Sequence, residues 1–336
     1  MATMLAVRFH SYGSPEVMGL EEVPRPLAGP GEVLIRIHAA SVNPLDWKVR
    51  AGYLKERLQH RLPLIPGWDV SGVVEAVGPE VTAFSIGDAV YGMLDFRRNG
   101  AYAQYVGANI KDLALKPASI DHIQAAAVPL AALTAWQSLF EVAGLAPGQT
   151  VLIHAAAGGV GHFAVQFAKW KGAKVIGTAS AGNESFLREL GADEVIDYRT
   201  TRFEEAVRDV DVVLDLIGGD TQQRSWKVLK KGGILVATLG IASPEAARKQ
   251  GVLGQGIGVH PDTAQLGQIA ALIDAGNLKP AVTAILPLAE AATAHALSQT
   301  GHVRGKIVLK VGDRTVESAN ADAGAGASKE AHPDPR

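Results

Sequence analysis

A glycine-rich turn between an apolar strand and an apolar helix constrains the fold of this chain more than any other feature. A strand is predicted over Val151–Ala155, the turn reads Ala157-Gly158-Gly159-Val160-Gly161, and a helix is predicted over Gly161–Lys171. Glycines let the backbone approach a diphosphate closely, and a helix N-terminus offers unpaired N–H groups. The match to G-x-G-x-x-G is imperfect, because Ala156 stands at the first glycine. The strand–turn–helix order still predicts a dinucleotide site at Gly158, Gly159, Val160 and Gly161.

Apolar strands alternate with helices from Thr150 onwards, which predicts a parallel sheet with helices on both faces. The further strands are predicted at Lys174–Thr178, Val210–Leu216 and Ile234–Leu239, and the helices at Asn183–Leu190 and Thr221–Lys230. The first 110 residues instead carry short apolar runs between Gly/Pro turns, which predicts a barrel-like or sandwich-like β domain. A length of 336 residues fits two such domains in an α/β protein.

Composition excludes several classes of function. The formal net charge of −2 argues against a nucleic-acid partner, because neutralising phosphates needs an excess of positive charge. The chain has no cysteine, which excludes disulfides, thiolate catalysis, iron–sulfur clusters and cysteine-ligated zinc. The longest uncharged run, residues 123–140, contains Pro129 and several polar residues, so it predicts a buried helix rather than a membrane span. With no signal-peptide pattern at the N-terminus, we expect a soluble, cytoplasmic protein.

The end of the second strand bears on the choice of cofactor. NAD sites usually place Asp or Glu there, about 20 residues after the glycine turn, to bind the ribose hydroxyls. Here that segment reads Ile176-Gly177-Thr178-Ala179-Ser180, with two hydroxyls and no carboxylate to repel a 2′-phosphate. The sequence therefore favours NADP over NAD, with Thr178 and Ser180 as candidate contacts. The alternative is that both hydroxyls only cap the turn.

At this point the chain resembles the zinc-independent medium-chain dehydrogenases/reductases of the quinone oxidoreductase (zeta-crystallin-like) family, from about Leu5 to Val311. The segments that carry the resemblance are Ala40–Asp46, Ile65–Gly78, Gly87–Tyr91, Gly100–Val106, Leu133–Trp136, Ala155–Gly161 and Leu190–Tyr198. The resemblance implies a GroES-like β-barrel catalytic domain, made by residues 1–122 and 278–315, with a Rossmann NADP-binding domain of doubly wound parallel sheet at 123–277. Residues 316–336 are expected to form a disordered tail.

The resemblance also bears on metals and on the 2′-phosphate. The zinc-dependent relatives have a cysteine where this chain has Asn43 and a His-Glu pair where it has Trp68-Asp69, so no zinc site is expected. Some quinone reductases grip the 2′-phosphate with a lysine on the loop after the second strand, but Glu184 stands near that position here. Either Arg199 or Lys174 takes over this contact, or the preference for NADPH is weaker.

The remaining candidate site residues rest on the resemblance. Asn43 is expected to contact the nicotinamide ribose or the substrate oxygen, or else to be a turn residue before Pro44. Tyr53 is a candidate donor to a developing oxyanion, or a packed loop residue. The further candidates for contacts with the cofactor are Thr134, Tyr198, Gly240 and Val259. Thr134 also suits plain helix packing, and Tyr198 also suits a strand-end aromatic.

The leading hypothesis is an NADPH-dependent oxidoreductase that reduces quinones or α,β-unsaturated carbonyls by hydride transfer without zinc. The rival is a catalytically idle NADPH-binding sensor, scaffold or RNA-binding protein of the same family. A third possibility is a zinc alcohol dehydrogenase. A homodimer is expected, with Gln255–Val259 as the edge strand that pairs between subunits.

Overall fold

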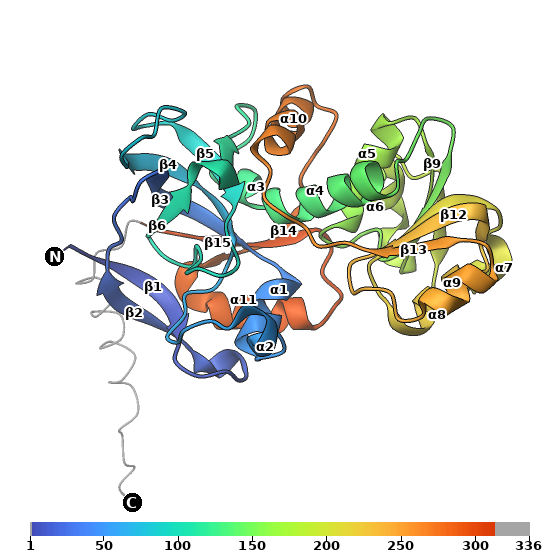
Figure 1. Cartoon of the computed structure of the whole chain (residues 1–336), viewed down its shortest axis with the longest axis horizontal. Helices are drawn as coiled ribbons and strands as arrows, with labels where there is room; N and C mark the ends of the chain where they lie inside the picture. The colour runs from blue at the N-terminus through green and yellow to red at the C-terminus, as the bar shows by residue number, and fades with distance from the viewer. Residues whose placement is uncertain (1, 313–336) are drawn as a thin grey trace, which may run out of the picture.

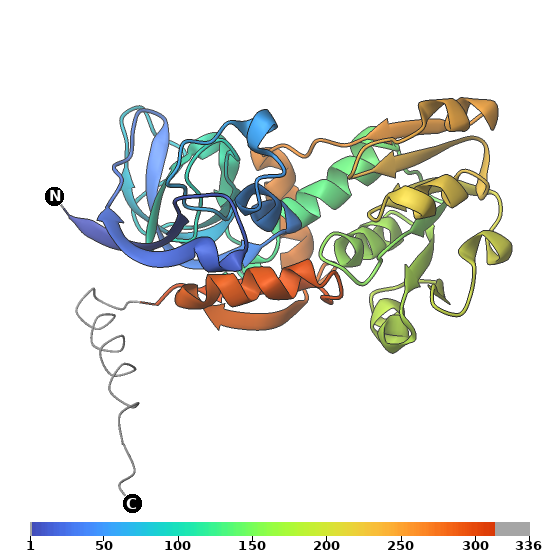
Figure 2. The same ribbon diagram turned by 90° about the horizontal axis from the view of Figure 1, so that it is seen from below.

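The structure is a computed structural model that describes residues 2–312, and it consists of two lobes lying side by side (Figures 1 and 2). Each lobe has its own sheet and its own hydrophobic core. The tail expected at 316–336 lies outside the described residues.

The first lobe contains the N-terminal strands and the last two strands of the described chain. Its larger sheet has the order β14-β15-β3-β4-β5-β7 with β6 paired to β3, and β1 and β2 form a separate antiparallel hairpin. The strands are β1 (Thr3–Phe9), β2 (Met18–Pro24), β3 (Glu32–Val42), β4 (Asp69–Val77), β5 (Ala89–Met93), β6 (Tyr105–Asn109), β7 (Leu113–Leu115), β14 (Val282–Pro287) and β15 (Lys306–Lys310).

Three helices of this lobe matter for the site. They are α1 (Pro44–Arg50), α2 (Lys55–Leu58) and α11 (Ala291–Gln299). The helix α1 starts where it does because Pro44 occupies its first turn and the Asp46 carboxylate accepts a hydrogen bond from the backbone N–H of Asn43.

The second lobe is built on a six-stranded parallel sheet with the order β10-β9-β8-β11-β12-β13 within the described residues. This is the doubly wound order 3-2-1-4-5-6, with its switch point between β8 and β11. The predicted parallel sheet is therefore confirmed. Its strands are β8 (Thr150–Ile153), β9 (Lys174–Ala179), β10 (Glu194–Asp197), β11 (Val210–Asp215), β12 (Leu229–Ala237) and β13 (Leu253–Gly256).

Helices cover both faces of this sheet, as the alternation of the strand residues requires. Val151 and Ile153 pack into one core with Phe163, whereas Leu152 between them packs into another with Trp226. The helices of this part of the chain are α3 (His122–Ala126), α4 (Pro129–Trp136), α5 (Gly161–Trp170), α6 (Glu184–Glu189), α7 (Phe203–Ala206), α8 (Gly219–Ser225), α9 (Pro244–Lys249) and α10 (Thr263–Asp274). Of these, α3 packs against β3 and β4, and α10 against β7, in the first lobe rather than on this sheet.

Two predicted helices differ in the structure. The uncharged run 123–140 does not form one helix but divides into α3, α4 and a π-helical turn at Gln137–Val142, because Pro129 begins a new helix. The helix predicted over Thr221–Lys230 ends at Ser225, and Lys230 already belongs to β12. Across residues 2–312, no helix has the length and apolar character needed to span a membrane.

The chain returns to the first lobe through its last two strands. Ile307–Lys310 of β15 pair antiparallel with Ala39–Val42 of β3. The predicted boundary at 122/123 falls inside α3, whose Ala126 packs with Ala39 and Val308 of the first lobe. The exact domain boundaries stay a prediction.

Candidate functional site

The glycine-rich turn leaves β8 at the switch point of the parallel sheet, where such sheets bind ligands. A Cβ added to Gly161 would clash with the Ala155 carbonyl oxygen and lie 2.6 Å from that of Ala156. Only glycine fits there, and it lets the first turn of α5 start directly under the strand. Ala155 itself takes a left-handed conformation, with φ of +49°.

The turn offers free donors. The backbone N–H groups of Gly159, Val160 and Gly161 have no backbone acceptor in the described chain, and they stand at the N-terminal end of the ten-residue helix α5. Such groups, together with the positive end of the helix dipole, bind phosphate oxygens. The turn therefore fits the diphosphate of a dinucleotide.

Lys306, the first residue of β15, connects this turn to the first lobe. A Cβ on Gly159 would lie 3.2 Å from Lys306 Cδ, so the lysine stem passes beside the turn. Its Nζ donates to the Asn43 side-chain oxygen and lies 3.4 Å from Asp69 Oδ2. Lys306 is only 3% exposed. A buried ammonium thus lies between the glycine turn and the N-terminus of α1.

Asp69 is the centre of the buried polar cluster around this ammonium. Its Oδ2 accepts from Ser41 at 2.7 Å and from the Asn43 amide at 2.8 Å, and its Oδ1 accepts from the backbone N–H of Leu130 at 2.7 Å. Burial lowers the pKa of Lys306, against the opposing attraction of Asp69 and Asp46.

Asp46 is the second carboxyl of the cluster and is fully buried. Its Oδ2 accepts from the Asn43 backbone N–H at 2.7 Å and from the Tyr102 hydroxyl at 3.0 Å. Burial and then repulsion by Asp69 raise the pKa of Asp46 to about 7, although the Asn43 N–H and Lys306 act in the opposite direction. His295 extends the network, with Nε2 3.3 Å from the Tyr102 hydroxyl.

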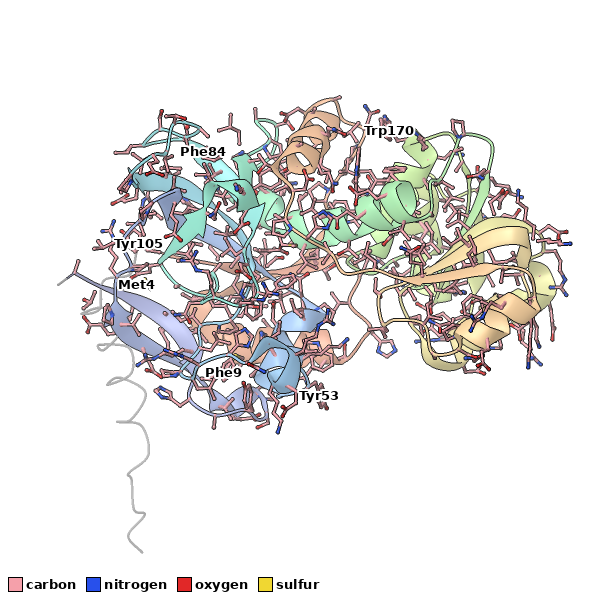
Figure 3. The ribbon with its side chains drawn as sticks, in the orientation of Figure 1. Met4, Phe9, Tyr53, Phe84, Tyr105 and Trp170 are labelled. Carbon is pink, nitrogen blue, oxygen red and sulfur yellow. The ribbon has the colours of Figure 1, made fainter. Side chains whose placement is uncertain are left out.

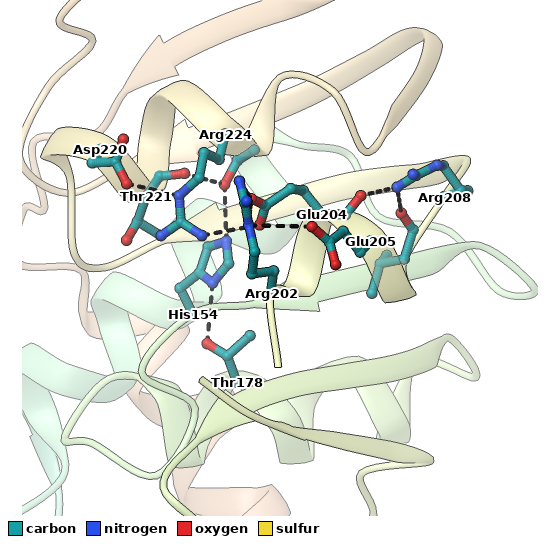
Figure 4. Close-up of polar contacts among 11 residues, drawn as sticks. His154, Thr178, Arg202, Glu204, Glu205, Arg208, Asp220, Thr221 and Arg224 are labelled. Atoms are coloured by element: carbon teal, nitrogen blue, oxygen red, sulfur yellow. Dashed lines mark hydrogen bonds and ion pairs between the residues drawn. The ribbon is translucent and has the colours of Figure 1, made fainter. Parts of the chain in front are cut away.

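The other end of the turn lies against a second buried network, drawn in Figure 4. Ser225 donates to the Thr221 carbonyl, so it accepts from His154 Nε2–H at 2.9 Å. His154 Nδ1 is then the acceptor for the Thr178 hydroxyl at 3.0 Å. Burial lowers the pKa of His154 to about 4, so the ring is neutral. Around it, Glu204 pairs with Arg202 at 2.8 Å and with Arg224 at 2.9 Å.

The loop that follows β9 begins at Ser180. Its Oγ accepts from the Asn183 amide at 3.1 Å, and Tyr198 from the next strand end donates its N–H to Ala179 O. Glu184 pairs with Arg188 one helical turn on at 2.9 Å. Arg304, from the segment before β15, binds this loop through Asn183 and the Gly182 carbonyl.

Two buried glutamines fix the loops after the later strands. Gln222 donates to Asp215 at 3.0 Å and to the Gly240 carbonyl at 2.9 Å, and accepts from the Ala242 N–H. Gln137, in the π-helical turn, bonds both backbone groups of His260, next to Val259.

The chain is similar to known proteins along most of its length. A family model described as alcohol dehydrogenase GroES-like domain matches residues 29–118, and one described as zinc-binding dehydrogenase matches residues 190–309. A quinone oxidoreductase structure from Coxiella burnetii has 39% identity and a TM-score of 0.88, and covers 93% of this chain and 100% of that chain. The 2-methylene-furan-3-one reductase of Solanum lycopersicum is 36% identical over 317 residues, with 91% and 79% of the two chains covered. The quinone oxidoreductase of Sus scrofa is 32% identical over 324 residues, with 91% and 97% covered.

The chain belongs to the medium-chain dehydrogenase/reductase family, in its quinone oxidoreductase group. The predicted family is thereby confirmed, as are the GroES-like lobe and the Rossmann lobe. Members of this family are nicotinamide-dependent oxidoreductases, and the mouse relative is named an NAD(P)H oxidoreductase, at 35% identity over 325 residues with 84% and 82% covered.

The zinc-ligand positions of this family hold a different arrangement here. Asn43 and Asp69 bond to each other and to the Lys306 ammonium. Both oxygens of Asp69 already accept hydrogen bonds. Among residues 2–312, no group of three or more His, Asp or Glu side chains is arranged to hold a metal ion. The side chains at these positions therefore do not fit a zinc ion.

The structure brings most of the predicted site residues to two places. Asn43 meets the glycine turn through Lys306, and Ser180 and Tyr198 lie together at the ends of β9 and β10. Thr178 is buried, with its hydroxyl proton directed to His154 rather than outward. Their contacts with a cofactor stay predictions.

The side chains of Thr134 and Tyr53 make their contacts with neighbouring residues of their own segments, not with these two places. The Thr134 hydroxyl donates to the Leu130 carbonyl in its own helix, at 2.7 Å. Tyr53 is 73% exposed, in edge contact with Trp47, and lies at the lower rim of the first lobe in Figure 3. A tyrosine so exposed is not held against reacting atoms by its surroundings, and its proposed role as a donor stays untested.

Sequence reasoning missed Lys306, Arg304, Gln137 and Gln222. The Arg304-Gly305-Lys306 tripeptide is the one with a visible signal, since two basic residues flank a glycine directly before an apolar strand. The glutamines lie inside helical segments and show no such signal, because only the tertiary fold reveals which loops they bond.

Proposed function

We propose that this protein is an NADPH-dependent, zinc-independent reductase of quinones or α,β-unsaturated carbonyls. The observation that carries the proposal is the contact of the glycine turn with the buried Lys306–Asn43–Asp69 cluster. It joins a diphosphate-binding turn in one lobe to fixed polar groups in the other.

Each part has a distinct role in this proposal. The free N–H groups at the start of α5 bind the diphosphate. The Asn43 side chain donates to Asp69 and accepts from Lys306, and these two bonds fix the plane of its amide. Its remaining N–H or lone pair is directed toward the ribose or the substrate oxygen. When bound, NADPH supplies a hydride from its nicotinamide ring. The chain orients that ring and excludes water.

The choice of acceptor follows from the chemistry of the cluster and from the relatives. Ketone reduction in the zinc-dependent relatives uses a Lewis acid on the carbonyl. Quinones and enones instead delocalise the charge that develops, so hydrogen bonds and a nearby ammonium suffice. Relatives named quinone oxidoreductase and 2-methylene-furan-3-one reductase act on acceptors of these two kinds, which supports the assignment.

The test is oxidation of NADPH, followed by the absorbance of the reduced nicotinamide, with a 1,4-quinone and with a short 2-alkenal, each repeated with NADH. We expect turnover of at least one acceptor, unchanged after dialysis against a chelator. Turnover with no acceptor despite NADPH binding would contradict the proposal and favour the idle NADPH-binding or RNA-binding alternative, for which salt-dependent RNA retention is the assay. Loss of activity on chelation would contradict zinc independence and indicate a metal-dependent reaction.

We also propose a cytoplasmic homodimer. The predicted edge strand Gln255–Val259 differs in the structure, where the outer strand β13 covers Leu253–Gly256. The four residues of β13 are all exposed, so this strand is the edge available for pairing between subunits. A monomer mass in light scattering would refute the dimer. Cell fractionation tests the location, since some relatives are named as mitochondrial.

A further inference from the structure

Arg304 is an exposed residue of the segment that leads into β15, and its side chain lies on the loop after β9 in the other lobe. Its Nε donates to Asn183 Oδ1 at 2.7 Å, and one Nη2 hydrogen goes to the Gly182 carbonyl at 2.9 Å. The guanidinium lies over the Phe186 ring, 5.2 Å from its centroid. Two contacts with this loop and one with the following helix α6 hold the cation in a defined place.

We propose that Arg304 binds the 2′-phosphate of NADPH and thereby sets a preference for NADPH over NADH. The inference rests on the proposed function, because it assumes a nicotinamide cofactor in the Rossmann lobe. It goes beyond that function by assigning the discrimination to a residue that the first lobe's C-terminal segment contributes.

The place is correct for a 2′-substituent. The strand β9 is the second strand of the doubly wound sheet, and the ribose of the adenosine half binds at its carboxyl end. The loop at that end runs from Ser180 to Asn183, which are the residues on which Arg304 lies. The adjacent backbone contact, from Gly305 N–H to Ala157 O at 2.8 Å, fixes the arginine beside the glycine turn.

The charge balance at the loop also favours a phosphate. Glu184, whose negative charge would repel a phosphate, is paired with Arg188. Within residues 2–312, Arg304 has no carboxylate partner, so its positive charge is uncompensated by the protein. Ser180 adds a hydroxyl.

The guanidinium keeps enough donors to bind an anion without leaving the loop. Of its five N–H groups, two bond to Asn183 and Gly182, and three remain, including both on Nη1. A bidentate contact with a phosphate needs two. Arg304 therefore does not have to give up its present contacts to bind the ligand.

Neither of the two basic residues suggested by the sequence has a side-chain contact with the loop from Ser180 to Asn183. Lys174 is at the first residue of β9, at the opposite end of the strand, and pairs with Glu194 at 2.6 Å. Arg199 follows the next strand and lies 5.8 Å from the Tyr198 ring. Arg199 is at the correct edge of the sheet, so it is the natural control.

The experiment compares wild type with Arg304→Gln and Arg199→Gln. Glutamine keeps a donor for Gly182 but removes the charge. Calorimetry measures binding of adenosine 2′,5′-bisphosphate and of adenosine 5′-monophosphate, which differ only in the 2′-phosphate. We expect wild type to prefer the bisphosphate, and R304Q to lose about 10- to 100-fold of that preference while its affinity for the monophosphate stays unchanged. R199Q is expected to behave as wild type.

Steady-state kinetics give the second readout. R304Q is expected to raise KM for NADPH, with KM for NADH and kcat little changed, and a melting curve checks that the variant is folded. An unchanged preference in R304Q, a loss in R199Q, or no preference in wild type would each overturn the inference. Bisphosphate binding that depends on Arg304 without turnover of any acceptor would uphold this inference and refute the proposed function. Equal turnover with NADPH and NADH would refute this inference and the NADPH dependence, and would still uphold the proposed reduction of quinones or enones.

Discussion

Asp46 provides a quantitative test of the buried cluster behind the proposed site, through the substitution Asp46→Asn. Its pKa lies at about 7 in the folded protein against an ordinary value of 3.8. A carboxyl that binds its proton more tightly when folded stabilises the fold below pH 3.8, and this stability is lost as the pH rises toward 7. The loss is about 4 kcal/mol, since the shift is about three units at 1.36 kcal/mol each.

Asparagine resembles the protonated form, because its carbonyl can still accept from the Asn43 N–H and the Tyr102 hydroxyl. The free energy of unfolding of D46N minus that of wild type should therefore rise by about 4 kcal/mol between pH 4 and pH 8. Most of this rise is expected below pH 7.

The assay is urea denaturation of both proteins at unit steps of pH. Other groups titrate in this range, above all His154, His162 and His295, whose pKa values burial lowers to about 4, 4 and 3. These histidines destabilise the fold as the pH falls below 6.5, but they are present in both proteins and cancel in the difference. Glu56→Gln, in an exposed turn of α2, is the control and should give a flat difference. Parallel stability curves for D46N and wild type would refute the assignment.

Two further substitutions test the turn and the ammonium. Gly161→Ala places a Cβ 2.6 Å from the Ala156 carbonyl oxygen, so the turn must shift. We expect the affinity for NADPH, measured by fluorescence titration, to fall by at least about tenfold. A folded variant that binds NADPH as tightly as wild type would contradict the role of the turn. Lys306→Met leaves the Asp69 carboxylate buried without its cation, which should cost about 3–5 kcal/mol of stability in urea denaturation. The double variant K306M/D69N should recover part of that loss, and strictly additive effects would show that the two residues do not interact.

The Rossmann lobe was predictable because its signals are local. A strand buried on both faces is a continuous apolar run, and the glycines at Gly158–Gly161 mark the turn between strand and helix. Helix ends were less predictable. The helix predicted to reach Lys230 ends at Ser225, because the following residues join β12, and a strand pairing cannot be seen in a local pattern. Likewise the π-helical turn at Gln137–Val142 depends on bonds to His260, more than a hundred residues away.

The candidate site was predictable on one side only. The glycine turn and the strand end at Ser180 can be recognised from residue type alone. The roles of Asn43 and Asp69 depend on a lysine that is distant in sequence, and a lysine in an apolar strand looks like a solvent-facing residue until the fold shows it to be 3% exposed. Thr178 shows the converse, because a hydroxyl at the correct place turns out to face His154.

The tripeptide Arg304-Gly305-Lys306 explains why the chain must return to its first lobe. Gly305 takes φ of +59°, and a Cβ there would lie 2.9 Å from that of Ala281, so glycine alone lets the segment cross at this point. On one side of it Arg304 lies on the loop after β9, and on the other Lys306 runs beside Gly159 to Asn43 and Asp69. The side chains of the two basic residues diverge from a backbone that is itself bonded to the glycine turn. Both ends of the proposed dinucleotide site are therefore positioned by pairing of β15 with β3, and a change that loosens this pairing should weaken the adenosine and nicotinamide contacts together.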